Sequence, residues 1–282
     1  MKAAQVVIVP KGVSLEETQL PFHTLQLEVD VETMRKLAEA DGGSDDFAEI
    51  NQLGGKFACD GLWTEWTISD GTPISSVIDR QQLVVVVSGA VQIPGAGAAQ
   101  IFGPGDVIVA PLTAGQTAEL ARSENCRTIH LLIASDLLEQ LGAAPKVHID
   151  RTRPAENPLI KRMITGPDQR SYFTGFDNFF PDSTGKPSPI YSTEGFWFAY
   201  FSDACFVDLH PEIVKNLVLP LSGSLQLGTA GDGQLHEFFP GDVCLADDSV
   251  GEGHTDRTDA PCGLLIVEMR ADGLWPMQEG ST

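Results

Sequence analysis

Histidines and carboxylates in the C-terminal half of the chain are the residues best suited to chemistry. His210, Glu212 and His254 stand there, and Asp208 precedes them. A histidine titrates near neutral pH and can take up or release a proton, so His210 and His254 are candidates for general acid–base catalysis. Successive residues of a β-strand alternate between its two faces, so Asp208, His210 and Glu212 are expected to share one face.

Other side chains that could react lack the sequence context that their chemistry needs. The five cysteines are widely spaced and include no C-x-x-C pair, which disfavours a zinc site or a disulfide framework. Ser88 and Ser222 precede glycines, but neither lies in the G-x-S-x-G motif of serine hydrolases. His130 lies in an apolar run, and we interpret it as a core histidine whose polar atoms are satisfied.

The elements that would hold the candidate residues occur twice in the chain. Residues 83–93 (LVVVVSGAVQI) resemble residues 217–227 (LVLPLSGSLQL), and residues 102–107 (FGPGDV) resemble residues 238–243 (FFPGDV). The shared Ser-Gly, Gln and Pro-Gly-Asp occur in the same order, which chance similarity between apolar strands does not explain. We therefore expect one domain that has been duplicated.

Within each copy the pattern is that of short β-strands. Runs rich in Val, Ile, Leu and Phe are separated by Gly, Pro and Asp turns, which predicts an all-β sandwich or barrel. A few short helices are added, over 31–41 and 136–141, each between a capping residue and a glycine. The Pro-containing segment 144–158 is expected to link an N-terminal domain, residues 1–143, to a C-terminal domain, residues 159–282.

Composition narrows the possible partners. The 282 residues carry 18 Lys and Arg against 39 Asp and Glu, a formal net charge of −21. This charge repels nucleic-acid phosphates and anionic membrane surfaces, so we expect neither as a partner. A cytoplasmic location is expected, because no run approaches the roughly 20 apolar residues of a membrane helix, the start lacks a secretory apolar region, and the cysteines suit a reducing compartment.

The C-terminal copy resembles the cupin superfamily. The resemblance rests on residues 221–223 (LSG), 240–243 (PGDV) and 247–254 (DDSVGEGH), which follow the order glycine turn, strand, Pro-Gly-Asp turn, strand and late histidine. It covers residues 160–270 well and residues 50–135 moderately. The whole chain is similar to a bicupin, which implies two tandem cupin domains, each a jelly-roll β-barrel.

The resemblance also implies a metal site in the second copy. Cupins typically hold a metal with two histidines two positions apart, a carboxylate near the following strand and a histidine of the second motif. Here those positions hold His210, Glu212, Asn216 and His254. In this reading His210, Glu212 and His254 bind one divalent metal (Fe, Mn or Zn), and the site supports Fe(II)-dependent dioxygenase chemistry.

The other catalytic reading needs no metal. Cupins include isomerases, cyclases and lyases, so the resemblance implies non-redox chemistry on a small organic molecule in the C-terminal barrel. His210 and His254 would then be the catalytic acid and base, and Glu212 or Asp208 would orient His210 or act as a second base. The residues expected to contact the substrate are Asn216, Trp197, Tyr200 and Phe206.

The first copy lacks the ligand residues, and a non-catalytic reading also stays open. The positions equivalent to the metal ligands hold Ser76, Ile78, Gln82 and Ala118. The N-terminal domain is therefore expected to have a degenerate site and to contribute stability or an interface, with a homodimer as the expected assembly. The non-catalytic reading is a small-molecule-binding protein in which His254 organises a turn by bonding Asp247 or Asp248.

Overall fold

The computed structural model describes the chain in separate segments. These are residues 5–8, 23–26, 50–67, 74–78, 82–93, 100–110, 118–133, 157–181, 187–201 and 204–270. They form strands and turns and no helix, so the all-β prediction is confirmed for this part of the chain, and no membrane-spanning helix is found there. The two predicted helices, over 31–41 and 136–141, lie outside the described residues.

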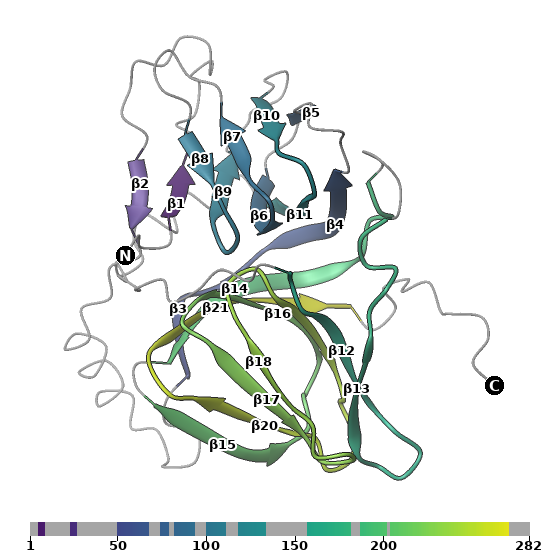
Figure 1. The fold of residues 1–282 in the computed structure, drawn as a ribbon. Coiled ribbons are helices and arrows are strands. Elements are labelled where there is room, and N and C mark those ends of the chain that lie inside the picture. Colours follow the sequence, from purple (N-terminus) through teal and green to yellow (C-terminus); the bar gives the residue numbers. More distant parts are fainter. Residues whose placement is uncertain are drawn as a thin grey trace.

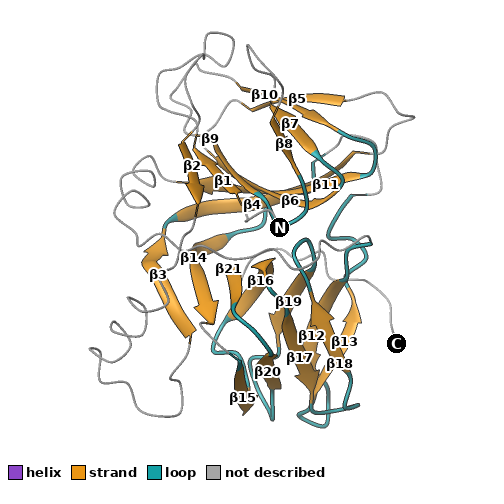
Figure 2. Ribbon diagram, turned by 60° about the vertical axis from the view of Figure 1, so that its left-hand side comes forward, coloured by secondary structure: helices purple, strands orange, loops and turns teal. Residues whose placement is uncertain are grey.

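Two sheets make up the first half of the chain (Figures 1 and 2). Their strands are β1 (Gln5–Ile8), β2 (His23–Gln26), β4 (Cys59–Thr67), β5 (Ile74–Ile78), β6 (Gln82–Ser88), β7 (Val91–Ile93), β8 (Gln100–Phe102), β9 (Val107–Ala110), β10 (Ala118–Arg122) and β11 (Cys126–Ile133). The larger sheet has the order β2-β1-β9-β6-β11-β4 and the smaller β5-β10-β7-β8. Buried side chains such as Val84, Val91, Ile108 and Leu120 pack together between the sheets.

The second half of the structure is built in the same way, and it also includes β3 (Ile50–Phe57), a strand from the N-terminal part of the sequence. Its strands are β3 (Ile50–Phe57), β12 (Ile160–Thr165), β13 (Ser171–Gly175), β14 (Thr193–Phe201), β15 (Cys205–His210), β16 (Lys215–Ser222), β17 (Leu225–Thr229), β18 (Leu235–Phe238), β19 (Val243–Asp247), β20 (His254–Thr258) and β21 (Cys262–Met269). The larger sheet has the order β13-β12-β19-β16-β21-β14-β3 and the smaller β15-β20-β17-β18. Buried side chains such as Phe201, Val218, Leu227 and Leu264 pack together between these sheets.

Strand order and turn chemistry agree between the halves. Apart from β3, each strand of the second half takes the sheet position of a strand in the first, so that β12, β19, β16, β21 and β14 correspond to β1, β9, β6, β11 and β4. The two Pro-Gly-Asp turns also use the same hydrogen bond. Asp106 Oδ2 accepts from Gly103 N at 2.6 Å, and Asp242 Oδ2 accepts from Phe239 N at 2.7 Å. These correspondences support the duplication expected from the sequence repeat.

One strand of the N-terminal region joins the sheet of the other half. β3 pairs antiparallel with β14, whereas β4, which follows after a single residue, pairs with β11. A second link is the bridge between Leu62 and Tyr191, whose backbone amides each donate to the other residue's carbonyl at 2.9 and 2.7 Å. Sheet hydrogen bonds therefore connect the two halves directly.

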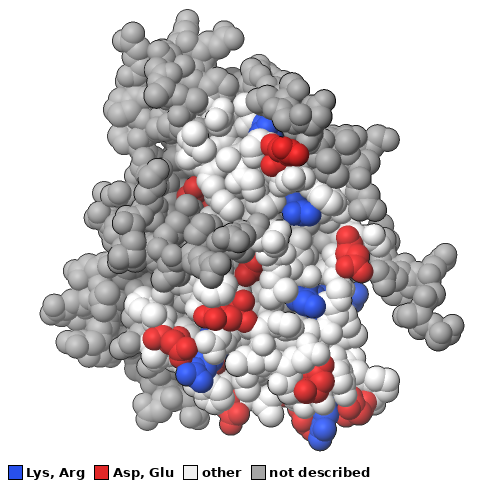
Figure 3. Space-filling model, viewed as in Figure 1, with Lys and Arg blue, Asp and Glu red and all other residues white. Residues whose placement is uncertain are grey.

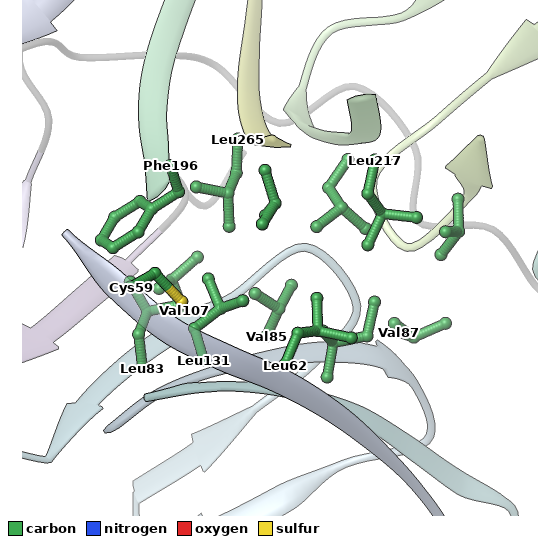
Figure 4. Packing of buried hydrophobic residues seen from close by; sticks show 14 of the residues in the cluster. Cys59, Leu62, Leu83, Val85, Val87, Val107, Leu131, Phe196, Leu217 and Leu265 are labelled. Carbon is green, nitrogen blue, oxygen red and sulfur yellow. The ribbon is translucent and has the colours of Figure 1, made fainter. Parts of the chain in front are cut away.

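The largest apolar cluster lies between the two large sheets (Figure 4). Leu83, Val85 and Leu131 of the first half meet Leu217 and Leu265 of the second, and each is at most 2% exposed. Each large sheet is thus covered on both faces, by its own small sheet and by the other half. This explains why every residue of β6 is buried and why its residues 83–87 are a continuous apolar run rather than an alternating one.

Charged side chains of the described residues are interspersed over the face shown in Figure 3. Several form exposed ion pairs, such as Arg257 with Asp259 at 2.7 Å and Arg270 with Glu194 at 3.0 Å. Exposed pairs of this kind contribute little to stability, on the order of 0–1 kcal/mol each. The apolar contacts between sheets, rather than these pairs, hold the fold together.

Candidate functional site

His210 and His254 lie side by side inside the second half. His210 ends β15 and His254 begins β20, and the two residues face each other in the antiparallel pairing of these strands. Their ring centroids are 4.6 Å apart. Gly253 makes this approach possible, because its φ is 74° and an added Cβ would lie 1.9 Å from the His210 carbonyl oxygen. The sequence Gly253-His254 is therefore a requirement of the site's backbone.

His254 is buried among carboxylates. Its Nδ1 lies 2.8 Å from Asp248 Oδ2, its Nε2 lies 3.3 Å from Asp256 Oδ1, and the residue is 1% exposed. Burial alone would lower the pKa of His254, but the carboxylates of Asp248 and Asp256 reverse this and raise it to about 10. Without another cation at this place, His254 is thus an imidazolium held between two carboxylates.

His210 has a similar arrangement at the more exposed side of the cluster. Its Nδ1 lies 2.8 Å from the backbone carbonyl of Asp208, and its Nε2 lies 3.7 Å from Asp256 Oδ2. The side chain is 27% exposed, so solvent reaches it. In both histidines an oxygen acceptor engages Nδ1, and Nε2 is turned toward the same carboxylate, that of Asp256.

His210, His254 and Asp256 form a group whose spacing could hold a metal ion. Each offers one ligand atom, and these atoms all lie within 4.8 Å of one another. Sequence reasoning did not select Asp256, although a usable signal was present. Asp256 follows His254 by two residues on β20, which places both on the same face of that strand.

Glu212, the carboxylate of the predicted ligand set, lies next to this group rather than within it. Its Oε1 is 4.0 Å from His254 Nε2, and its Oε2 accepts from Asn216 Nδ2 at 2.8 Å. Burial, the largest of several influences, raises the pKa of Glu212 to about 7. The structure therefore brings together His210, Glu212, Asn216 and His254, but it places Asp256 closer than Glu212 to His254 Nε2 and also within 3.7 Å of His210 Nε2.

The remaining predicted site residues lie away from the cluster, except Tyr200, whose side chain the structure does not describe. Asp208 is exposed and its carboxylate accepts from the Leu209 amide at 2.8 Å; the register shift between Val207 and His210 removes it from the face of His210. Phe206 is 63% exposed and lies on the outer surface. Trp197 is half-buried and packs against the apolar interior of the second half. The side chain of Tyr200 lies outside the described part of the structure.

The first half has a different polar cluster in its interior. No histidine stands at the positions that correspond to the second-half site, where Ser76 and Ile78 lie on β5, Gln82 on β6 and Ala118 on β10. Instead, Arg122 of β10 donates to the carboxylate of Glu65 of β4, and its Nη2 lies 3.4 Å from His130 Nε2. Arg122 is 2% exposed, so this ion pair is buried in the barrel interior.

His130 is a satisfied core residue, as its sequence context indicated. It is 1% exposed, Thr128 Oγ1 lies 2.9 Å from its Nε2, and Gln82 Oε1 lies 3.3 Å from its Nδ1. The ring stacks on Trp63 with 4.8 Å between centroids. Burial, the main influence, lowers the pKa of His130 to about 3.

This pKa predicts an acid-sensitive contribution to stability. In the unfolded chain His130 protonates near pH 6.5, whereas in the folded state it stays neutral until about pH 3. Its contribution is therefore fully present above pH 6.5 and is lost as the pH falls toward 3. We expect the free energy of unfolding to fall by about 3 kcal/mol more between pH 7 and pH 4 in the natural protein than in a His130→Gln variant. Denaturant unfolding curves at each pH measure this difference; parallel pH profiles would exclude it.

Three comparisons place these findings among known proteins. No protein-family model matches the sequence, and no curated protein matches it. Solved structures do match, among them a cupin 2 conserved barrel domain protein from Leptotrichia buccalis, with 11% identity and a TM-score of 0.37 over 82% of this chain and 94% of that chain. The duplicated order of paired sheets in the present structure agrees with the jelly-roll architecture expected from the sequence.

Two further matched structures are enzymes. A salicylate 1,2-dioxygenase from Pseudaminobacter salicylatoxidans has 12% identity and a TM-score of 0.34, over 86% of this chain and 83% of that chain. An oxalate decarboxylase variant from Bacillus subtilis has 13% identity and a TM-score of 0.25, over 80% of this chain and 67% of that chain.

Proposed function

We propose that this chain is a cupin-type enzyme that uses a divalent cation, held by His210, His254 and Asp256, to act on a small organic molecule. One observation carries the proposal. Both imidazoles have Nδ1 engaged by an oxygen, Asp248 Oδ2 for His254 and the Asp208 carbonyl for His210, while both Nε2 atoms approach Asp256. Histidines that bind metals commonly have this arrangement, since the second-shell acceptor fixes the tautomer and orients the ring.

The donor set fits a divalent transition metal. Two imidazole nitrogens and one carboxylate are the ligands that Fe(II), Mn(II) and Zn(II) accept in proteins, and three protein ligands leave positions for substrate. The buried negative charge around His254 also favours a cation there. When bound, such an ion polarises a substrate oxygen or lowers the pKa of a bound water.

Glu212 and Asn216 supply the proton-transfer chemistry in this proposal. Glu212 is partly exposed beside the ligand group, and the hydrogen bond from Asn216 Nδ2 holds one of its oxygens, so Oε1 is available to take a proton from a substrate and return it elsewhere. This arrangement favours non-redox reactions, namely isomerisation or elimination, in which a carbon-bound proton is removed. Asp248 keeps His254 oriented and acts only through it.

The experiment is a titration of the metal-free protein with Co(II), Mn(II) and Zn(II). We expect one tight site per chain, with Co(II) absorption bands that report nitrogen and oxygen ligands. An exposed-carboxylate variant, Asp259→Asn, is expected to behave like the natural protein, because Asp259 is exposed and pairs with Arg257 and Gln226 at the surface, away from the ligand group. Absence of a stoichiometric site would overturn the proposal. Oxygen uptake by the Fe(II)-loaded protein during substrate turnover would replace non-redox chemistry with dioxygenase chemistry.

A further inference from the structure

A hairpin at the start of the second half holds the loop that leads into His254. The hairpin consists of β12, β13 and the turn between them, and the loop is residues 248–253, between β19 and β20. Hydrogen bonds join the two, from Thr165 Oγ1 to the Val250 carbonyl at 2.8 Å, from the Glu252 amide to the Gln169 carbonyl at 2.8 Å, and from Ser171 Oγ to the Gly253 carbonyl at 2.5 Å. The last of these contacts reaches the residue next to a proposed metal ligand.

The hydroxyl of Ser171 is held in one orientation. Ser171 is 1% exposed, and its Oγ accepts from the Ala230 amide at 3.0 Å while it donates to the Gly253 carbonyl. The Ser171 carbonyl also accepts from the Gly231 amide at 2.9 Å. Because the hydroxyl is both donor and acceptor, it cannot rotate without breaking one of these bonds, which is costly for groups removed from water. Ser171 therefore ties β13 to the turn after β17 and to the loop before β20.

The direction of the Gly253 carbonyl affects His254 because the two residues share a peptide plane. Gly253 has a φ of 74°, and an added Cβ would lie 1.9 Å from the His210 carbonyl oxygen, so this position requires glycine. Glycine adopts positive and negative φ about equally readily, so Gly253 by itself does not fix that plane. Rotation of the plane changes ψ of Gly253 and φ of His254 together. The hydrogen bond from Ser171 selects one direction and thereby sets where the His254 side chain leaves its strand.

We infer that Ser171 is a positioning residue for the proposed metal site, acting through the Gly253 peptide and touching neither metal nor substrate. The inference rests on the proposed function, since its consequence is felt at His254 Nε2, a proposed ligand atom. Asp248 fixes the rotation of the His254 ring through Nδ1, at 2.8 Å, whereas Ser171 fixes the backbone from which the ring extends. Both are needed to place one nitrogen at a metal. Loss of a residue that orients a metal ligand typically costs about 10- to 100-fold in affinity.

The test compares two buried serines of the second half. Ser171→Ala removes the hydrogen bond to Gly253, and Ser171→Cys is a second variant that keeps the side-chain shape but has a weaker donor. Ser222→Ala is the matched control, because Ser222 is 0% exposed, its Oγ accepts from the Gly263 amide at 3.2 Å, and it lies at the opposite end of β16 from Asn216. We expect both Ser171 variants to weaken Zn(II) binding, by about tenfold in Ser171→Ala, and to alter the Co(II) absorption bands. Ser222→Ala should lower thermal stability but leave the metal affinity and the bands unchanged.

A measurement without metal separates this inference from the proposed function. In the metal-free protein, hydrogen–deuterium exchange of peptides covering 250–258 should be about fivefold faster in Ser171→Ala than in Ser222→Ala. Equal exchange in the two variants, Ser171 variants with the natural Zn(II) affinity and Co(II) bands, or an equal loss of affinity in Ser222→Ala would each overturn the inference. Failure of the natural protein to bind stoichiometric metal would instead overturn the proposed function, while the exchange rates would still decide whether Ser171 holds the His254 backbone.

Discussion

Replacing Asp256 by Ala is expected to weaken divalent-metal binding by about 100-fold or more. Among the residues that the structure describes, Asp256 is the carboxylate that approaches both imidazoles, with Oδ1 3.3 Å from His254 Nε2 and Oδ2 3.7 Å from His210 Nε2. Loss of a residue that only orients a ligand typically costs 10- to 100-fold in affinity, so loss of a ligand should cost more. Competition titration against a chromophoric chelator measures the change.

Glu212→Gln is the matched comparison, because it removes a carboxylate in the same cluster without changing side-chain size. Glu212 Oε1 lies 4.0 Å from His254 Nε2, and its other oxygen already accepts from Asn216. We expect metal affinity to change by less than about threefold in this variant, and turnover to fall by about 100-fold if Glu212 moves the proton. The reverse pattern, with metal lost in Glu212→Gln and kept in Asp256→Ala, would restore the ligand set that the sequence suggested.

Arg122→Met is expected to destabilise the protein by about 3–5 kcal/mol. Arg122 is 2% exposed and donates to Glu65, and its removal leaves a largely buried carboxylate whose other neighbours are Trp63 Nε1 at 3.2 Å and His130. Breaking a buried pair from one side has this cost because the remaining charge stays desolvated. Chemical denaturation near pH 7, where His130 is neutral, measures the decrease in the free energy of unfolding.

Two further variants test whether the loss of stability in Arg122→Met comes from the buried charge of Glu65. The double variant Glu65→Leu, Arg122→Met removes both charges and should lose less stability than Arg122→Met alone. Arg127→Met changes a nearby arginine that lies over the Trp66 ring at 4.1 Å, and it should cost only about 1 kcal/mol. Equal losses in the two single variants would show that the effect comes from side-chain packing rather than from the buried charge.

The paired histidines and the repeat were accessible from the sequence because both depend on short-range patterns. A strand run ending in Ser-Gly, followed by Pro-Gly-Asp, produces the same local hydrogen bonds wherever it occurs, as Asp106 and Asp242 demonstrate. The positive φ of Gly253, next to His254, is likewise a local feature, whereas its close approach to His210 depends on the pairing of β15 with β20. All-β structure and the absence of histidines at the first-half positions could therefore be stated from residues alone.

Only the tertiary structure shows which carboxylate lies next to the imidazoles of His210 and His254. Alternation along β15 predicted that Asp208, His210 and Glu212 share a face, but a register shift between Val207 and His210 breaks the alternation and turns Asp208 to solvent. Which carboxylate meets the imidazoles then depends on how β15 pairs with β20, a relation between strands that are far apart in sequence. That pairing brings the carboxylate of Asp256 to 3.3 Å from His254 Nε2 and 3.7 Å from His210 Nε2.

The pairing of β3 with the second half, and the polar cluster inside the first half, could likewise be established only from the tertiary structure. β3 pairs with β14 and β4 with β11, although the two strands are consecutive, and Glu65 meets Arg122 across 57 positions of sequence. Residues that far apart carry no local pattern that marks them as partners. The sequence by itself determined the strand type, the duplicated order of turns and the two histidines, because those follow from neighbouring residues. Sheet register and closure decided which side chains converge, because they depend on packing of the whole chain.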